Sequence, residues 1–250
     1  MLPADAPSPF PPSGPCDLLE HMPAALLVEF EGVLVETRDA RRDALMRALA
    51  DDGLSLPDDE YDARCAGLPV REAARAAAAF AGAGLDETAL DLLTLRAERD
   101  FVARIGTGVT LAPGAAALLD GAAGRARLAL VTRASRREVE FVLTLAGLEA
   151  AFECVVAADD APPKPSPAPY RRALERLSRR RAVRAADSLA LEDGAAGAVA
   201  ARAAGVPCVV VDPAGARGAE AASAVVRTLD GHSLTTLDAL VRRADVEVPA

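Results

Sequence analysis

Polar side chains that could form a metal or phosphate site accompany four short apolar runs of the sequence. They are Glu29 and Glu31 in VEFEGVLVET, Thr132 in LALVTRAS, Lys164 in APPKPSPAPY, and Glu192 with Asp193 in LALEDGAAG. Carboxylates gathered at one place repel one another unless a divalent cation joins them, and Mg²⁺ is the ion that prefers such oxygen ligands. A metal ion, an ammonium group and a hydroxyl together hold the charge of a transferring phosphoryl group. These residue types therefore indicate magnesium and phosphate chemistry.

Lys164 stands out because the composition is biased against lysine. The chain has 28 basic residues, of which Lys164 is the one lysine, and it contains no asparagine and no glutamine. Arginine takes most places where lysine would serve equally well. The one lysine that persists is therefore a candidate for a specific role in the site.

The apolar runs predict the strands that must position these residues. The runs are AALLVEF (24–30), RLALVT (127–132), FECVVAA (152–158), DSLALED (187–193) and VPCVVVD (206–212). Short, near-continuous apolar strands are typical of a parallel sheet that is covered on both faces. In such open α/β sheets, ligands bind beyond the carboxyl ends of the strands. We therefore expect the polar residues to meet in one crevice.

Helical segments separate the predicted strands. Ser135 and Glu138 have the spacing of a capping box at the start of a helix that Gly147 ends. Ser166 can cap a second helix, with Pro167 at its first position, and an alanine-rich segment at 194–205 forms a third. Strands that alternate with helices predict a doubly wound α/β domain built from residues 24–37 and 107–250.

The remaining segments break this alternation. Residues 38–106 contain helical segments only, at 39–52, 58–65, 69–81 and 86–105, with Asp86 as a good cap for the last. A helical block directly after the first strand predicts an inserted all-α cap domain. Residues 1–23 hold seven prolines and no usable periodicity, so we expect a disordered Pro-rich tail.

Composition excludes several classes of partner. The net charge of −9 argues against nucleic acid, because phosphate contacts need clustered cations. No apolar run approaches the roughly 18 residues that a membrane span requires. The four cysteines are scattered and include no CxxC pair, so they predict neither a disulfide framework nor a zinc site. We expect a reduced, cytoplasmic protein.

Four motifs in order carry a resemblance to a known family. An acid–x–acid–GVLV–x–T sequence follows the first strand, Thr132 follows the second, KPSP contains Lys164, and ED opens EDGAAG. This order resembles the haloacid dehalogenase superfamily over about residues 24–215. It is most similar to the branch with a helical cap between the first and second motifs, which includes phosphoglycolate phosphatases and β-phosphoglucomutase. The resemblance implies a Rossmann-like core.

The resemblance also implies chemical roles for the motif residues. In the family, an Asp at the position of Glu29 attacks phosphorus and forms an aspartyl-phosphate. An Asp at the position of Glu31 is the general acid and base, and its backbone carbonyl binds Mg²⁺. The residue at the position of Thr132 holds the phosphoryl oxygens. The lysine at the position of Lys164 neutralises the charge of the nucleophile and of the phosphate.

Metal and substrate residues are implied in the same way. Glu192 and Asp193 match the acidic pair that holds Mg²⁺, so the implied metal site comprises Glu29, Glu31, Glu192 and Asp193. The expected substrate is a small phosphorylated metabolite. Arg71 in the helical block, where the family presents substrate-binding groups, and Arg133 next to Thr132 are the further candidates for binding it.

The sequence departs from the family at the first motif. Glu29, Glu31 and Glu36 stand where the family has Asp. One extra C–C bond moves the attacking oxygen by up to roughly 1.5 Å, and a misplacement of about 1 Å can cost on the order of 100-fold in rate. Two interpretations stay open. The protein is a Mg-dependent phosphatase or phosphomutase with weak activity, or it is a pseudoenzyme that binds Mg²⁺ and a phosphorylated ligand as a sensor or partner protein.

Overall fold

A six-stranded sheet forms the centre of the protein. The computed structural model describes residues 21–106, 108–214 and 220–246. All strand pairs are parallel, and the order is β3-β2-β1-β4-β5-β6. The strands are β1 (Ala25–Val28), β2 (Arg127–Val131), β3 (Cys154–Val156), β4 (Ser188–Glu192), β5 (Cys208–Val211) and β6 (Ala224–Val226). The predicted parallel α/β sheet is confirmed. The strand β6 was not predicted, because its apolar run is confined to Ala224–Val226, whereas the equally short β3 lies within the longer apolar run 152–158.

Alternating residues of the strands build a core on each face of the sheet. Leu26 and Val28 of β1 join the larger core, which is covered by α5 (Ala115–Ala122), α6 (Arg136–Ala146) and α9 (Leu234–Val246). Ala25 and Leu27 face the other way, toward α7 (Ala168–Ser178) and α8 (Ala195–Ala203). Both faces are therefore buried, which explains why the strands read as near-continuous apolar runs.

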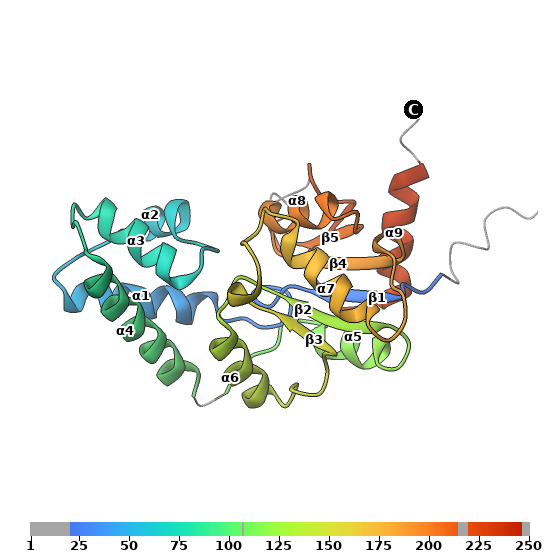
Figure 1. The fold of residues 1–250 in the computed structure, drawn as a ribbon, viewed down its shortest axis with the longest axis horizontal. Coiled ribbons are helices and arrows are strands. Elements are labelled where there is room, and N and C mark those ends of the chain that lie inside the picture. The colour runs from blue at the N-terminus through green and yellow to red at the C-terminus, as the bar shows by residue number, and fades with distance from the viewer. Residues whose placement is uncertain (1–20, 107, 215–219, 247–250) are drawn as a thin grey trace, which may run out of the picture.

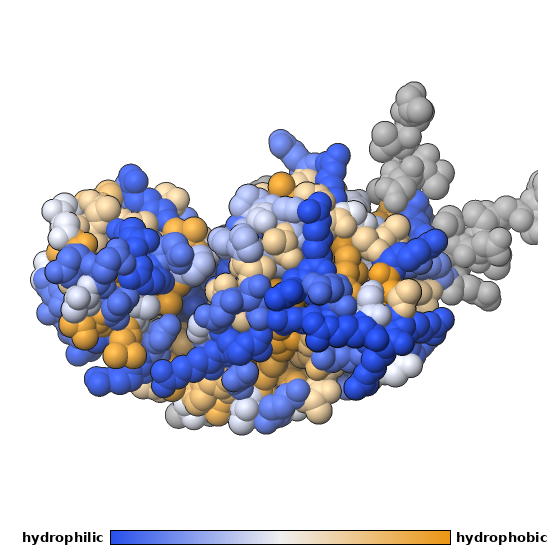
Figure 2. Space-filling model, in the orientation of Figure 1, coloured by the Kyte–Doolittle hydropathy of each residue, from blue (hydrophilic) through white to orange (hydrophobic). Residues whose placement is uncertain are grey.

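Four helices between β1 and α5 form a group with its own apolar core. They are α1 (Arg38–Asp51), α2 (Asp58–Arg64), α3 (Val70–Phe80) and α4 (Glu87–Ile105). Leu45, Leu49, Leu90 and Leu93 are among the residues buried between them. Figure 1 shows the group beside the sheet, and Figure 2 shows an indentation of the surface between the two parts. The helix bounds agree with the predicted segments to within one residue.

Local capping signals set several helix ends. Asp86 accepts a hydrogen bond from the Ala89 N–H at 2.8 Å and so caps α4. Ser135 accepts from the Glu138 N–H at 3.3 Å, and Gly147 ends α6 in the left-handed conformation, with φ of 66°. The predicted capping box is only half formed, because the Glu138 carboxylate instead accepts hydrogen bonds from Arg41.

Two other predictions need adjustment. The seventh helix begins at Ala168, one residue later than expected, with Pro167 as its N-cap and the Ala168 N–H donating to Ser166 Oγ at 3.3 Å. Residues 1–20 of the predicted tail lie outside the described residues. None of the helices in the described ranges combines the length and hydrophobicity that crossing a bilayer requires.

Candidate active site

The carboxyl ends of the three central strands bring the predicted residues together. Val28 of β1 stands in register with Leu130 of β2 and Leu191 of β4. The residues that follow are therefore neighbours, and they are Glu29, Thr132, Glu192 and Asp193. The Glu29 N–H still donates to the Leu191 carbonyl at 2.9 Å, which fixes the backbone where the site begins.

Lys164 lies at the centre of this group, although it comes from the loop between β3 and α7. Its Nζ donates to Glu29 Oε2 at 2.5 Å, to the Val131 carbonyl at 2.8 Å, and to Glu192. Its side chain is 1% exposed. An ammonium group has three donors, so the protein itself occupies every donor of Lys164.

Glu29 is held at both carboxylate oxygens. Lys164 donates to Oε2, and the Phe30 N–H donates to Oε1 at 2.6 Å. Burial alone would raise the pKa of Glu29, but the charge and hydrogen bond of Lys164, together with hydrogen bonds from Thr132 and the Phe30 N–H, outweigh it and lower that pKa. Glu29 is therefore an ionised carboxylate at neutral pH, which a nucleophile or a metal ligand has to be.

Glu192 sits in a different environment from Glu29. Its burial, together with the charges of Glu29 and Asp193, raises its pKa to about 7 against the opposing effect of Lys164. The Tyr170 hydroxyl also donates to it. Burial and the Glu192 carboxylate raise the pKa of Tyr170 well above its usual range, so this hydroxyl remains a donor.

A glycine of α8 makes room for the Glu192 side chain. A Cβ on Gly197 would lie 1.8 Å from Glu192 Oε2, closer than any real contact. Glu192 is therefore packed between α8, Lys164 and Tyr170. Its main role in this arrangement is to hold the ammonium group of Lys164 beside Glu29.

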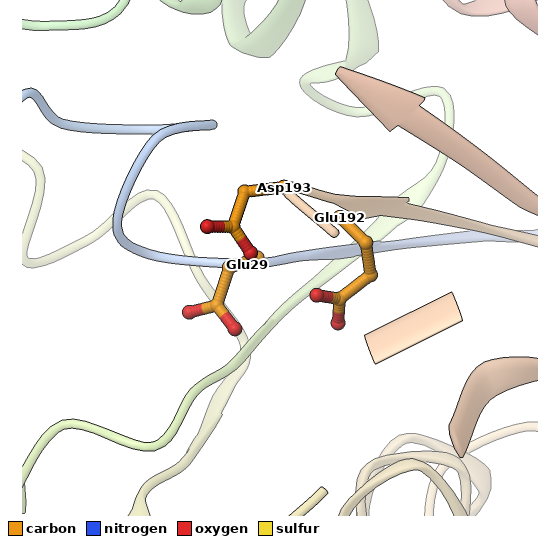
Figure 3. Close-up of side chains that lie close together, drawn as sticks. All are labelled: Glu29, Glu192 and Asp193. Carbon is orange, nitrogen blue, oxygen red and sulfur yellow. The ribbon is translucent and has the colours of Figure 1, made fainter. Parts of the chain in front are cut away.

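Asp193 completes a group of three acids. One carboxylate oxygen from each of Glu29, Glu192 and Asp193 lies within 4.8 Å of the other two (Figure 3). Figure 3 shows that the three side chains come from the neighbouring ends of β1 and β4. Arg38 of α1 donates to Asp193 Oδ2 at 2.8 Å. Burial and Glu29 raise the pKa of Asp193, as expected for carboxylates crowded together.

Glu31 lies in the same hollow but outside this acidic group. Its Oε1 accepts from Thr37 Oγ1 at 3.2 Å and from Arg41 Nε at 3.0 Å. The hollow is lined by Glu29, Glu31, Arg41, Gly67, Leu68, Thr132, Arg133, Ala134 and Asp193. Its lining residues come from the ends of β1, β2 and β4 and from the helical group, so the hollow lies between the strand ends and that group.

The two predicted substrate-binding arginines are placed differently. Arg133 lines the hollow and lies against Gly67. A Cβ atom on Gly67 would lie 2.4 Å from the Arg133 guanidinium. Arg71 is not brought to the hollow, since its guanidinium pairs with Glu87 at 2.6 Å and Asp91 at 2.7 Å on α4. The helical group contributes Gly67 and Leu68 to the wall instead.

The sequence missed Arg38, Arg41 and Tyr170. The two arginines gave no signal because arginine is abundant throughout the chain. Tyr170 is fully buried on α7, and its hydroxyl serves the site through Glu192. A tyrosine among the apolar residues of a helix gives no sign of such a role.

The chain matches the family model described as haloacid dehalogenase-like hydrolase over residues 26–211. The chain belongs to the haloacid dehalogenase-like hydrolase family. The resemblance that the four motifs carried is thereby confirmed. The matched residues include every strand that contributes to the site described above.

Three known proteins resemble this chain in sequence or in fold. The phosphoglycolate phosphatase of Rhodospirillum rubrum is 35% identical over 200 residues, which cover 76% of this chain and 80% of that protein. CbbY of Rhodobacter sphaeroides, solved in complex with xylulose 1,5-bisphosphate, has a TM-score of 0.76 at 27% identity, covering 87% of this chain and 100% of that one. β-Phosphoglucomutase of Clostridium difficile shares the fold, with a TM-score of 0.79 at 18% identity over 90% of this chain and 100% of its own.

Proposed function

We propose that the protein is a Mg²⁺-dependent phosphatase or phosphomutase that acts slowly on a small phosphorylated metabolite. The observation that carries the proposal is Glu29, an ionised carboxylate that lines the hollow with Lys164 on one side and Asp193 close by. Phosphoglycolate, which gives one relative its name, and xylulose 1,5-bisphosphate, which is bound in the crystal structure of CbbY, are small phosphorylated molecules. They support the proposed substrate class.

Glu29 and Asp193, with Glu192 behind them, are the side chains that would hold Mg²⁺. All three offer the carboxylate oxygens that this ion prefers, and two oxygens on one Mg²⁺ lie up to about 4.2 Å apart. The observed separations, within 4.8 Å, need only a small closure. The family resemblance adds the backbone carbonyl of Glu31. A bound Mg²⁺ would supply charge stabilisation to the phosphoryl group.

The chain's own residues would carry the reaction in two stages. The Glu29 carboxylate attacks phosphorus and forms an acyl-phosphate while Glu31 gives a proton to the departing oxygen. Water, losing its proton to Glu31, then cleaves that acyl-phosphate and restores Glu29. The Thr132 hydroxyl and the Arg133 guanidinium would bind phosphoryl oxygens, and Lys164 keeps Glu29 ionised.

The helical group of residues 38–106 would act as the cap over this reaction. Gly67 and Leu68 already form part of the wall of the hollow. Excluding water from the site would strengthen its electrostatic interactions. Arg71 stays a predicted substrate ligand, and its ion pairs with Glu87 and Asp91 would have to open first.

A specific observation favours a second candidate function, that of a silent binding protein. Both oxygens of Glu29 are engaged within the protein, and Lys164 has no donor left for a phosphoryl oxygen. The longer glutamate arm permits this folded-back arrangement. Such a protein would bind Mg²⁺ and a phosphorylated ligand without turnover.

Hydrolysis of p-nitrophenyl phosphate with Mg²⁺ separates the two candidates. We expect slow turnover by the wild type, none by Glu29→Gln, and a gain of up to about 100-fold in the Glu29→Asp, Glu31→Asp double variant. Glu36→Asp is the matched control, because it makes the same chemical change outside the hollow.

Three outcomes are informative. Fast turnover by the wild type, with no gain in the double variant, would contradict the expected impairment. No turnover by the wild type, together with Mg²⁺ binding by calorimetry, would support the silent protein. No Mg²⁺ binding at millimolar concentration would argue against both.

A further inference from the structure

Arg41 connects three parts of the molecule at the edge of the hollow. It lies in the first turns of α1, and its side chain is 13% exposed. Its Nε donates to Glu31 Oε1 at 3.0 Å. Its Nη1 donates to Glu138 Oε2 at 2.9 Å, and its Nη2 donates to the other oxygen of the same carboxylate.

Several contacts fix the Arg41 side chain in place, unlike that of an exposed ion pair. The guanidinium fork meets Glu138 at both oxygens, which is the geometry that fixes an arginine most firmly. The ring of Phe101 on α4 lies 5.1 Å from the guanidinium carbon. Glu138 is 7% exposed and gives up its capping-box bond to serve as the partner. The third donor, Nε, is thereby aimed at Glu31.

Glu31 needs such a partner because of its length. Glutamate has one more rotatable bond than the aspartate that the family has at this position, and each free rotor must be fixed for a proton transfer with defined geometry. Thr37 and Arg41 both bind Oε1. Oε2 has no hydrogen-bond partner among the described residues and is the oxygen left to face a ligand.

The Arg41 guanidinium keeps its positive charge in this environment. Burial would lower the pKa of Arg41, but the carboxylates of Glu138 and Glu31 outweigh it and raise that pKa above its usual range. One guanidinium thus serves two carboxylates and stays charged at any working pH.

We infer that Arg41 is a positioning residue that holds the Glu31 carboxylate over the hollow, with Glu138 of α6 as the anchor. The inference rests on the proposed role of Glu31 as general acid and base. It assigns α1 and α6 a part in catalysis that no motif of the sequence indicates. It also makes the position of Glu31 depend on how the helical group docks against the sheet.

The first test is structural and needs no activity. Crystal structures of the wild type, Arg41→Lys and Arg41→Met would show where the Glu31 carboxylate lies. We expect an ordered carboxylate in the wild type and a displaced or disordered one in both variants. Arg47→Met is the matched control, because Arg47 is an exposed arginine of the same helix whose ion pair, among the residues that the structure describes, is with Asp51. An unmoved Glu31 in Arg41→Lys would overturn the inference.

The second test is kinetic and uses a double-mutant cycle with Glu31→Gln. With glycerol phosphate, whose leaving oxygen needs a proton, we expect Arg41→Lys to lower kcat by about 10-fold to 100-fold with little change in KM. In the Glu31→Gln background the same change should have almost no effect, because the group it positions no longer transfers a proton.

The outcomes distinguish this inference from the proposed function. Equal losses in both backgrounds would mean a general structural role and would overturn the inference. If the wild type hydrolyses no phosphomonoester, the proposed function fails, and the crystal structures still decide whether Arg41 positions Glu31. If Arg41→Met does not fold, Arg41→Lys and Glu138→Gln, which preserve volume more closely, carry both tests.

Discussion

Glu192 shows how much of the site depends on one buried side chain. It accepts hydrogen bonds from Lys164 and Tyr170 and lies against Gly197. Removing Lys164 or Tyr170 would take a hydrogen-bond donor from a buried carboxylate, which is costly in a low-dielectric interior. The position of Lys164, and through it that of Glu29, therefore depends on residues that never touch a substrate.

Gly197→Ala tests this dependence on a single methyl group. Because its Cβ would overlap the Glu192 carboxylate, we expect a loss of about 1–3 kcal/mol in the free energy of unfolding and a displaced Lys164. Urea denaturation measures the first and a crystal structure the second. Gly121→Ala is the control, since Gly121 lies in helix α5 with open space around it and should gain about 0.5–1 kcal/mol. Equal stabilities of the two variants would contradict the prediction.

At this scale the sequence predicted that Glu29, Glu192 and Asp193 meet. It also placed Glu31 in that group, where the structure does not have it, and it did not reveal which residues hold the acids. Glu29, Thr132 and Asp193 follow strands, and the geometry of a parallel sheet is enough to bring strand ends together. Arg41 binds Glu31 while its guanidinium is also held by Glu138 of α6, 97 residues away in the chain. Such a contact depends on packing between distant segments, so no local pattern encodes it.

Among the elements, the short 3-10 helix Ala158–Asp160 ties α6 to α7. Asp160 accepts hydrogen bonds from Arg136 of α6 at 2.5 Å and from Arg176 of α7 at 2.6 Å. Partial burial would raise its pKa, but the hydrogen bonds from Arg176 and the Ala157 N–H and the charge of Arg136 hold it at about 2. This connection fixes α6, which carries Glu138, beside the strand ends.

The acid sensitivity of this connection is predictable. A pKa depressed from 3.8 to about 2 stabilises the fold above pH 3.8, and the contribution is lost as the pH falls through 2. With an allowance for solvent screening it amounts to on the order of 1–2 kcal/mol. Asp160→Asn should lose it at neutral pH and show a shallower fall in stability between pH 5 and 2, measured by urea denaturation at each pH. Glu175→Gln, on the exposed face of α7, is the control, and parallel curves for Asp160→Asn and wild type would contradict the prediction.

Across the whole molecule, the acidic side chains are most crowded where the central strands end. The net charge is −9, and Lys164 and Arg38 offset only part of the charge of the group Glu29, Glu192 and Asp193. Crowded carboxylates destabilise the fold in the absence of a counter-ion, and a cation that binds only the folded state stabilises it by mass action. Metal affinity should therefore be visible as thermal stability.

Mg²⁺ at ten times its dissociation constant should stabilise the protein by about 1.4 kcal/mol. For a chain of this size the melting temperature then rises by about 3–6 °C. Scanning calorimetry at constant ionic strength, set with NaCl, would measure the shift. Asp193→Asn should remove it, whereas Asp91→Asn on the surface of the helical group should keep it. A shift that survives Asp193→Asn would place the ion elsewhere.

The order of the strands has a consequence for synthesis. The first strand made, β1, is flanked in the finished sheet by β2 and β4, which are made much later. On the ribosome, the nascent chain must keep this apolar segment from pairing wrongly while α1–α4 emerge and bury their own leucines. Glu29 therefore has neither Lys164 nor Asp193 beside it until most of the polypeptide has been translated. A chaperone that shields β1 during this interval would act on the segment on which the entire site depends.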